Sequence, residues 1–185
     1  MTEITGETSI VIQVPAQKVY EYLLDFTRHP EWVKNLQRVR QESGGPIHVG
    51  TTFQAQEGPP PVTFGQKLQM MLYFLTGVLS GAKTYSRAEI TGLEPNRRIA
   101  WKAGVPKGDG YFNLAHWELL LEPQGQATHL TQRFTYQPQN GVARRMVDAA
   151  GASGLEQACA VSLGQLKQRL ERNSVETHYG LKANL

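Results

Sequence analysis

The chain has 185 residues, of which 40% are hydrophobic and 19% are charged, a balance that suits one globular domain and excludes a disordered chain. The formal net charge is only +3, and the lysines and arginines are scattered along the sequence. Without a dense basic stripe interleaved with aromatic residues, we expect no nucleic-acid binding.

The sequence contains no apolar run of about 18 residues, so a membrane-spanning helix is not expected. The first residues, MTEITGETSIVIQV, lack the basic region and apolar core of a secretory signal. Cys159 is the only cysteine, which excludes an internal disulfide and suits a reducing compartment. We therefore expect a cytoplasmic protein.

The first third of the chain predicts a strand, two short helices and two more strands. Residues 8–14 are rich in β-branched side chains and predict a strand that ends before Pro15. Pro15 suits the first turn of a helix extending to about Asp25. We expect Thr27 to cap a second short helix, with Trp32 as its buried anchor. Further strands are predicted at 36–43 and 49–56, ahead of a break at Gly58 and three prolines.

An apolar segment at about 58–81 is the unusual part of the chain. Its apolar side chains, which include Met71, recur at helical spacing, although three glycines weaken the helix prediction. One interpretation is an extra helix packed on the sheet edge or on a second subunit, which would make a homo-oligomer. Another is a lid over a cavity or a membrane contact. We favour packing or a lid, because only Lys67 and Lys83 supply nearby positive charge.

The remainder predicts four strands, at 84–93, 98–103, 111–121 and 128–136, followed by a long helix at 141–172. One face of this helix is apolar and consists of Leu155, Cys159, Leu163, Leu166 and Leu170. Strands joined by short turns predict an antiparallel sheet, and the helices must cover one of its faces. The sequence therefore predicts one α+β domain over residues 1–172, followed by a poorly ordered tail at 173–185.

Several segments in this order resemble a known family. They are Val14-Pro15-Ala16 through Pro30-Glu31-Trp32, Val49-Gly50-Thr51, Leu93-Glu94-Pro95-Asn96-Arg97, and Trp117-Glu118-Leu119 with Leu121-Glu122-Pro123. Together they are similar to the START-related SRPBCC superfamily, in particular its polyketide cyclase/dehydrase and lipid-transport-like group. The resemblance implies a helix-grip fold, in which a curved antiparallel sheet of about seven strands wraps a long C-terminal helix around an apolar cavity. It does not imply a single activity.

Residue patterns for common catalytic chemistry are missing from the sequence. The five histidines, His29, His48, His116, His129 and His178, show no metal-ligand spacing, so we expect no metal. Cys159 falls on the apolar helix face, where a buried structural thiol is expected rather than a nucleophile. Nucleotide-, dinucleotide- and hydrolase-type glycine motifs are absent, and no cofactor is expected. No catalytic residue is assigned.

Strand alternation instead predicts a ligand-binding inner face. Asn113 and Gln132 place amides on otherwise apolar faces, where a ligand, a water or a neighbour would satisfy them. Tyr111 and Tyr136 could orient a polar end of an apolar ligand. The register stays open, because a slip by one residue would reverse every assignment. The candidate ligand-binding residues are Phe53, Met71, Phe74, Trp101, Tyr111, Asn113, Trp117, Gln132, Phe134, Tyr136 and Met146.

Three functions are compatible with the sequence. The first is binding or transport of a hydrophobic small molecule, such as a lipid, an isoprenoid or a polyketide, in an internal cavity. The second is a cyclase or dehydratase that moves protons with pocket tyrosines or histidines. The third is a protein-interaction module that uses residues 62–79. We rank the enzyme second, because the sequence shows no convincing acid–base pair.

Overall fold

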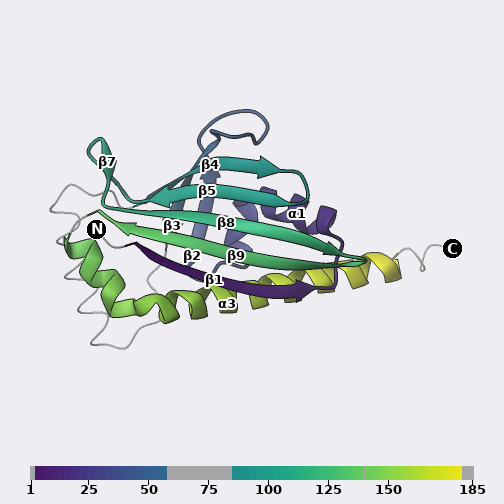
Figure 1. Cartoon of the computed structure of the whole chain (residues 1–185). Helices are drawn as coiled ribbons and strands as arrows, with labels where there is room; N and C mark the ends of the chain where they lie inside the picture. Colours follow the sequence, from purple (N-terminus) through teal and green to yellow (C-terminus); the bar gives the residue numbers. More distant parts are fainter. Residues whose placement is uncertain (1–2, 58–84, 140, 181–185) are drawn as a thin grey trace.

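The computed structural model of the protein describes residues 3–57, 85–139 and 141–180; the side chains of 142–143, 146–151 and 175–180 lie outside the description (Figure 1). The predicted insertion at 58–81 also lies outside it. The elements are, in order, β1 Ile4–Ile12, α1 Ala16–Leu24, the 3₁₀ helix η1 Phe26–Glu31, β2 Leu36–Gln41, β3 Thr52–Glu57, β4 Ser86–Glu94, β5 Arg98–Gly104, β6 Pro106–Lys107, β7 Gly110–Tyr111, β8 Asn113–Gln124, β9 Ala127–Pro138 and α3 Gly141–Gly180.

Seven of the strands form one sheet in the order β1-β9-β8-β5-β4-β3-β2, and every neighbouring pair is antiparallel. β6 and β7 form a separate two-stranded sheet. The curved seven-stranded sheet and the long C-terminal helix confirm the predicted α+β helix-grip architecture (Figure 1). Among the described residues, no helix has the length and apolarity needed to cross a membrane.

α3 runs alongside β1 and covers this edge of the sheet. The Glu7 N–H donates to Oε1 of Glu156 at 3.4 Å, and the Gln13 N–H donates to Oε1 of Glu171 at 2.7 Å. Between these two contacts α3 advances by about 22 Å and β1 by about 20 Å. The helix and the strand therefore run side by side over this length. Because an edge strand has unpaired amides, the two glutamates protect it from pairing with another chain.

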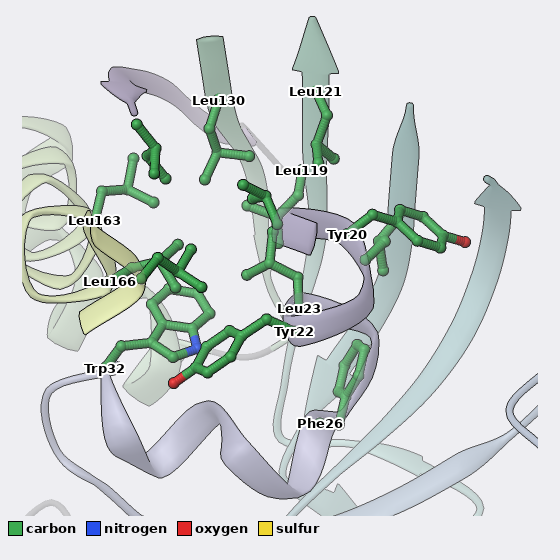
Figure 2. Packing of buried hydrophobic residues seen from close by; sticks show 14 of the residues in the cluster. Tyr20, Tyr22, Leu23, Phe26, Trp32, Leu119, Leu121, Leu130, Leu163 and Leu166 are labelled. Atoms are coloured by element: carbon green, nitrogen blue, oxygen red, sulfur yellow. The ribbon is translucent and has the colours of Figure 1, made fainter. Parts of the chain in front are cut away.

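The C-terminal half of α3 closes the core against α1 and the sheet. Leu163 and Leu166 are 1% and 0% exposed, as the apolar helix face predicts. Figure 2 shows them facing Trp32, Leu23 and the strand residues Leu119, Leu121 and Leu130. Burying one such leucine contributes roughly 1.5–3 kcal/mol, so this region anchors the helix to the sheet.

The structure corrects several local predictions. η1 is capped by Asp25, whose Oδ1 accepts the Thr27 N–H at 3.1 Å, so Thr27 is not the cap. The predicted buried anchor is confirmed, with Trp32 1% exposed. Val49 is 55% exposed and precedes β3, because Gly50 with φ +93° turns the chain before Thr52. The C-terminal helix continues to Gly180, beyond the end predicted near Arg172.

Candidate functional site

An aromatic row crosses the inner face of the sheet. Trp101 of β5 pairs with Trp117 of β8, which pairs with Phe134 of β9. The ring centroids lie 6.2 Å apart for the first pair and 5.6 Å apart for the second. Trp101 and Phe134 are 8% and 4% exposed, but Trp117 between them is only half-buried. The middle of this row is therefore accessible from the inner side of the sheet.

The row continues through stacked rings beneath the first helices. Phe26 lies 5.3 Å from Trp101 in an edge-on arrangement and 4.7 Å from Phe53, on which it stacks. Phe53 is fully buried, with 0% exposure. Phe53 therefore sits behind the row and supports it from within the core.

His29 belongs to the same aromatic group, which the sequence did not predict. Its ring stacks on Phe26 at 4.2 Å, and its Nε2 lies 2.8 Å from the Leu23 carbonyl oxygen. Burial lowers the pKa of His29 to about 4, against the opposing effect of the Leu23 hydrogen bond. A neutral imidazole near pH 7 suits an apolar wall. The i, i+3 spacing of Phe26, His29 and Trp32 was the available sequence signal.

A polar rim borders the aromatic row at one end of the sheet. Oδ1 of Asn113 accepts the Val105 N–H at 2.8 Å, and the Asn113 side chain also hydrogen-bonds Tyr136. Burial raises the pKa of Tyr136, the Asn113 hydrogen bond lowers it, and the negative charge of Glu57 raises it. Oγ of Ser86 donates to Oε1 of Glu57 at 3.0 Å. The rim thus combines a phenol, an amide and a carboxylate beside an apolar surface.

Glu57 is a rim residue that the sequence reasoning missed. It follows Phe53 and Ala55 at two-residue spacing in β3, so alternation places it on the inner face. The signal was available in the sequence, but the predicted strand ended at Gln56. Its proximity to Tyr136 could not be foreseen, because β3 and β9 are separated by three other strands of the sheet.

Gln132 lies on the inner face, as alternation predicts, and pairs in register with Leu119 and Thr8. The residue is 6% exposed, and its Oε1 has no hydrogen-bond partner among the described residues. An unsatisfied buried acceptor costs about 1–3 kcal/mol, which a donor brought into this region would recover.

The remaining candidates are distributed differently. Tyr111 belongs to β7 and pairs with Pro106, so the predicted strand 111–121 is split and its sheet portion begins at Asn113. The chain reverses locally, with the Phe112 N–H donating to the Val105 carbonyl oxygen at 2.8 Å. Gly104 permits this close approach, since any side chain there would collide with the Asn113 backbone and the Tyr111 ring. Met71, Phe74 and the side chain of Met146 lie outside the described residues.

Metal and thiol chemistry gain no support from the described part of the chain. No group of three or more His, Cys, Asp or Glu side chains there could hold a metal. Cys159 is 7% exposed, as predicted for a structural thiol. Burial, with the Glu156 charge adding to it, raises the pKa of Cys159 to about 11, so the thiol stays protonated near neutral pH.

Two surface pockets of about 290 Å³ each are formed by described residues. One lies between α1 and the end of α3, where it is lined by Tyr22 and Leu170 among others. The other lies on the outer face of β2 and β3 and is lined by Arg38 and Arg40 among others. Neither coincides with the predicted cavity between the sheet and α3. The cavity beside the aromatic row and its polar rim therefore stays a prediction.

Comparisons with known proteins agree on the architecture. The family described as polyketide cyclase/dehydrase and lipid transport matches residues 3–171. The Zhui aromatase/cyclase from Streptomyces sp. R1128 is similar with a TM-score of 0.64 and 15% identity, covering 94% of this chain and 96% of that one. Protein CV1439 from Chromobacterium violaceum has a TM-score of 0.58 and 16% identity, covering 91% and 97%. At these identities the similar structures show the fold alone. No curated protein sequence matches this chain.

Proposed function

This chain belongs to the polyketide cyclase/dehydrase and lipid transport family, and from that premise we propose that it binds a hydrophobic small molecule against the inner face of its sheet. The ligand class is a lipid, an isoprenoid or a polyketide-like molecule, carried or stored rather than altered. The contact surface is the aromatic row formed by Trp101, Trp117 and Phe134.

The half-buried state of Trp117 is the observation that carries this proposal. Its two neighbours in the row are buried, and its ring lies on the apolar inner face rather than on the outside of the sheet. An aromatic ligand stacked there would gain about 0.5–1.5 kcal/mol per ring pair beyond the contribution of buried area. A sealed core would leave no such ring accessible.

The rim would orient the ligand. Tyr136, Asn113 and Glu57 offer hydrogen-bonding groups beside the apolar surface, which suits a molecule with an apolar body and one polar end. Gln132 adds an unsatisfied acceptor on the same face. A ligand with a hydroxyl group would fit this arrangement better than a pure hydrocarbon.

Intrinsic fluorescence tests the proposal directly. The chain has three tryptophans, Trp32, Trp101 and Trp117. The rings of Trp32 and Trp101 both contact the His29 ring, and Trp101 stacks on Trp117. We expect saturable quenching by neutral apolar probes such as 1-naphthol, farnesol or N-phenyl-1-naphthylamine. Trp117→Leu should weaken probe affinity by about tenfold, which corresponds to about 1.4 kcal/mol.

Val49→Ala is the matched control, because Val49 is an exposed apolar residue outside the aromatic group. Its probe affinity should equal that of the parent protein. Absence of saturable binding by all three probes would reject the binding function. Equal weakening by Val49→Ala and Trp117→Leu would mean that the probes adsorb to surface apolar groups.

A cyclase or dehydratase is the second candidate, favoured by Glu57 and Tyr136 at one rim. The raised pKa of Tyr136 keeps its phenol protonated at neutral pH, so it could donate a proton while Glu57 accepts one. With a poly-β-ketone substrate, Tyr136→Phe should then abolish product formation while 1-naphthol binding survives. Unchanged product formation by both Tyr136→Phe and Glu57→Gln would reject this role.

The third alternative, a protein-interaction module at residues 62–79, lies outside the described residues and stays a prediction. Deleting residues 58–81 tests it. Loss of a partner with retained probe binding would support an interaction module, and retained association would reject it.

A further inference from the structure

Four polar side chains form a square on the outer face of β2 and β3. Arg38 pairs in register with Gln56, and Arg40 pairs with Gln54. Val39 of β2 packs against the hydrophobic core, so its neighbours Arg38 and Arg40 point to the opposite face. This face is separate from the aromatic row, which lies on the inner side of the sheet.

The square and Tyr85 line the outer-face pocket of about 290 Å³. Each lining side chain carries at least one hydrogen-bond donor: a guanidinium, an amide or a phenol. No carboxylate and no aliphatic side chain is among the described residues that line it. The described lining of the pocket therefore presents two positive charges and an excess of donors.

Elsewhere on the sheet, two cationic side chains are neutralised by a carboxylate directly opposite them. Lys102 lies opposite Glu89 and forms an ion pair with it at 3.0 Å, and Arg133 lies opposite and bonds Glu7. Opposite Arg38 and Arg40 the register places glutamines instead.

The carboxylate of Glu42, which directly follows β2, does not neutralise the two arginines either. Glu42 forms an ion pair with Arg87 of β4 at 2.9 Å. Within the described part of the chain, Arg38 and Arg40 have no ion-pair or hydrogen-bond partner for their side chains. No described residue thus occupies their guanidinium groups, which could bind an external anion.

We propose that Arg38, Arg40, Gln54, Gln56 and Tyr85 form a binding site for a small molecule that carries a phosphate monoester. A phosphate monoester is close to a dianion near pH 7 and would neutralise both guanidinium charges. Its three terminal oxygens accept several hydrogen bonds, which the two arginine forks and the glutamine amides supply. A monocarboxylate matches only one of the two charges.

The site fits a soluble phosphate monoester rather than a membrane surface. Its volume of about 290 Å³ is at the lower end of ligand pockets, which suits a compact molecule. Since the described lining has no apolar side chain, it offers nothing to insert between lipids.

Isothermal titration of the full chain with phenyl phosphate at low ionic strength tests the site. We expect one saturable site, with benzoate at least about tenfold weaker because it carries one charge. Arg38→Gln combined with Arg40→Gln should weaken phenyl phosphate by at least about tenfold, since two charge-assisted contacts are lost. Both arginines are exposed, so this variant should fold normally. Arg38→Lys with Arg40→Lys should bind at an intermediate strength.

Arg133→Gln is the matched control, because it removes one exposed arginine charge from the same sheet. It should leave phenyl phosphate affinity unchanged within about twofold. If Arg133→Gln and the double variant weakened phenyl phosphate binding equally, the cause would be the overall charge of the protein. That result would overturn the proposed site. Absence of phenyl phosphate binding would also overturn the proposed site. This holds even if vesicles that contain phosphatidic acid bind through the two arginines.

Discussion

Trp101 and Trp117 lie almost parallel across the β5–β8 pairing, with ring centroids 6.2 Å apart and ring planes inclined by 12°. The two rings differ in burial, since Trp101 is 8% exposed and Trp117 is half-buried. Substitution of Trp101 should therefore mainly lower stability, whereas substitution of Trp117 should mainly weaken ligand binding.

Trp101→Leu should lower the free energy of unfolding by about 2–4 kcal/mol, because it leaves a cavity among Phe26, His29 and Trp117. Trp117→Leu should cost less than about 1.5 kcal/mol, because solvent can occupy part of the space. Urea unfolding followed by far-ultraviolet circular dichroism measures both values. Equal losses would show that Trp117 is a core residue rather than an accessible wall.

His29 should make the protein less stable in mild acid. Its pKa is about 4 when folded, against an ordinary value of 6.5, so below pH 6.5 the unfolded chain binds a proton that the folded chain excludes. The contribution of neutral His29 to the free energy of unfolding is fully present above pH 6.5 and is lost as the pH falls toward 4. Between pH 7 and pH 5 the loss should be about 2 kcal/mol.

Urea unfolding at pH 7 and pH 5 measures this dependence. His29→Phe should be less stable at pH 7, because it lacks the Leu23 hydrogen bond, but its stability should change less between the two pH values. An unchanged pH dependence in His29→Phe would place the titrating group elsewhere in the protein.

Glu31 should matter more to stability than its partner Arg169. Its carboxylate accepts the Tyr22 Oη–H at 2.9 Å and pairs with Arg28 at 3.2 Å and with Arg169 of α3 at 3.1 Å. Burial, with Glu31 adding to it, raises the pKa of Tyr22 to about 12. Glu31→Ala should cost about 1–3 kcal/mol, because the partly buried Tyr22 hydroxyl loses its acceptor.

Arg169→Ala is the comparison variant and should cost less than about 1 kcal/mol, since its side chain is 43% exposed. Thermal or urea unfolding resolves this difference. Similar losses in Glu31→Ala and Arg169→Ala would mean that the ion pair between η1 and α3, rather than the tyrosine hydrogen bond, stabilises the junction.

Two glycines should respond in opposite ways to alanine. A Cβ at Gly6 would collide with the Phe134 ring of the aromatic row, whereas a Cβ at Gly164 in α3 would meet nothing within 4 Å. Gly6→Ala should lower stability by about 1–3 kcal/mol and weaken 1-naphthol binding by displacing Phe134. Gly164→Ala should raise stability by about 0.5–1 kcal/mol with unchanged binding. Melting temperatures and fluorescence titrations test both, and a neutral Gly6→Ala would mean that the Phe134 ring moves freely.

Much of the inner face could be predicted from alternation alone. Trp101, Trp117, Gln132 and Phe134 all lie where a two-residue period places them, because the leucines and tryptophans of these strands define the buried side. Tyr111 was misplaced, because a local chain reversal at 105–112 interrupts the period. Whether the inward residues contact a ligand stays a prediction.

Local sequence patterns were sufficient to predict the architecture. β-branched strands, short turns and a final helix with apolar residues at three- and four-residue spacing leave few arrangements other than an antiparallel sheet covered by that helix. The same local patterns determined that Cys159, Leu163, Leu166 and Leu170 would be buried.

Contacts between side chains, in contrast, depend on the tertiary structure. Glu57 comes near Tyr136, and Arg38 stands opposite a glutamine, because strand order and register bring together residues that are distant in the sequence or independent of local periodicity. His29 becomes a neutral ring in an aromatic wall for the same reason. Periodicity specifies the face of a side chain, but its charge state and partners depend on the neighbours that packing supplies.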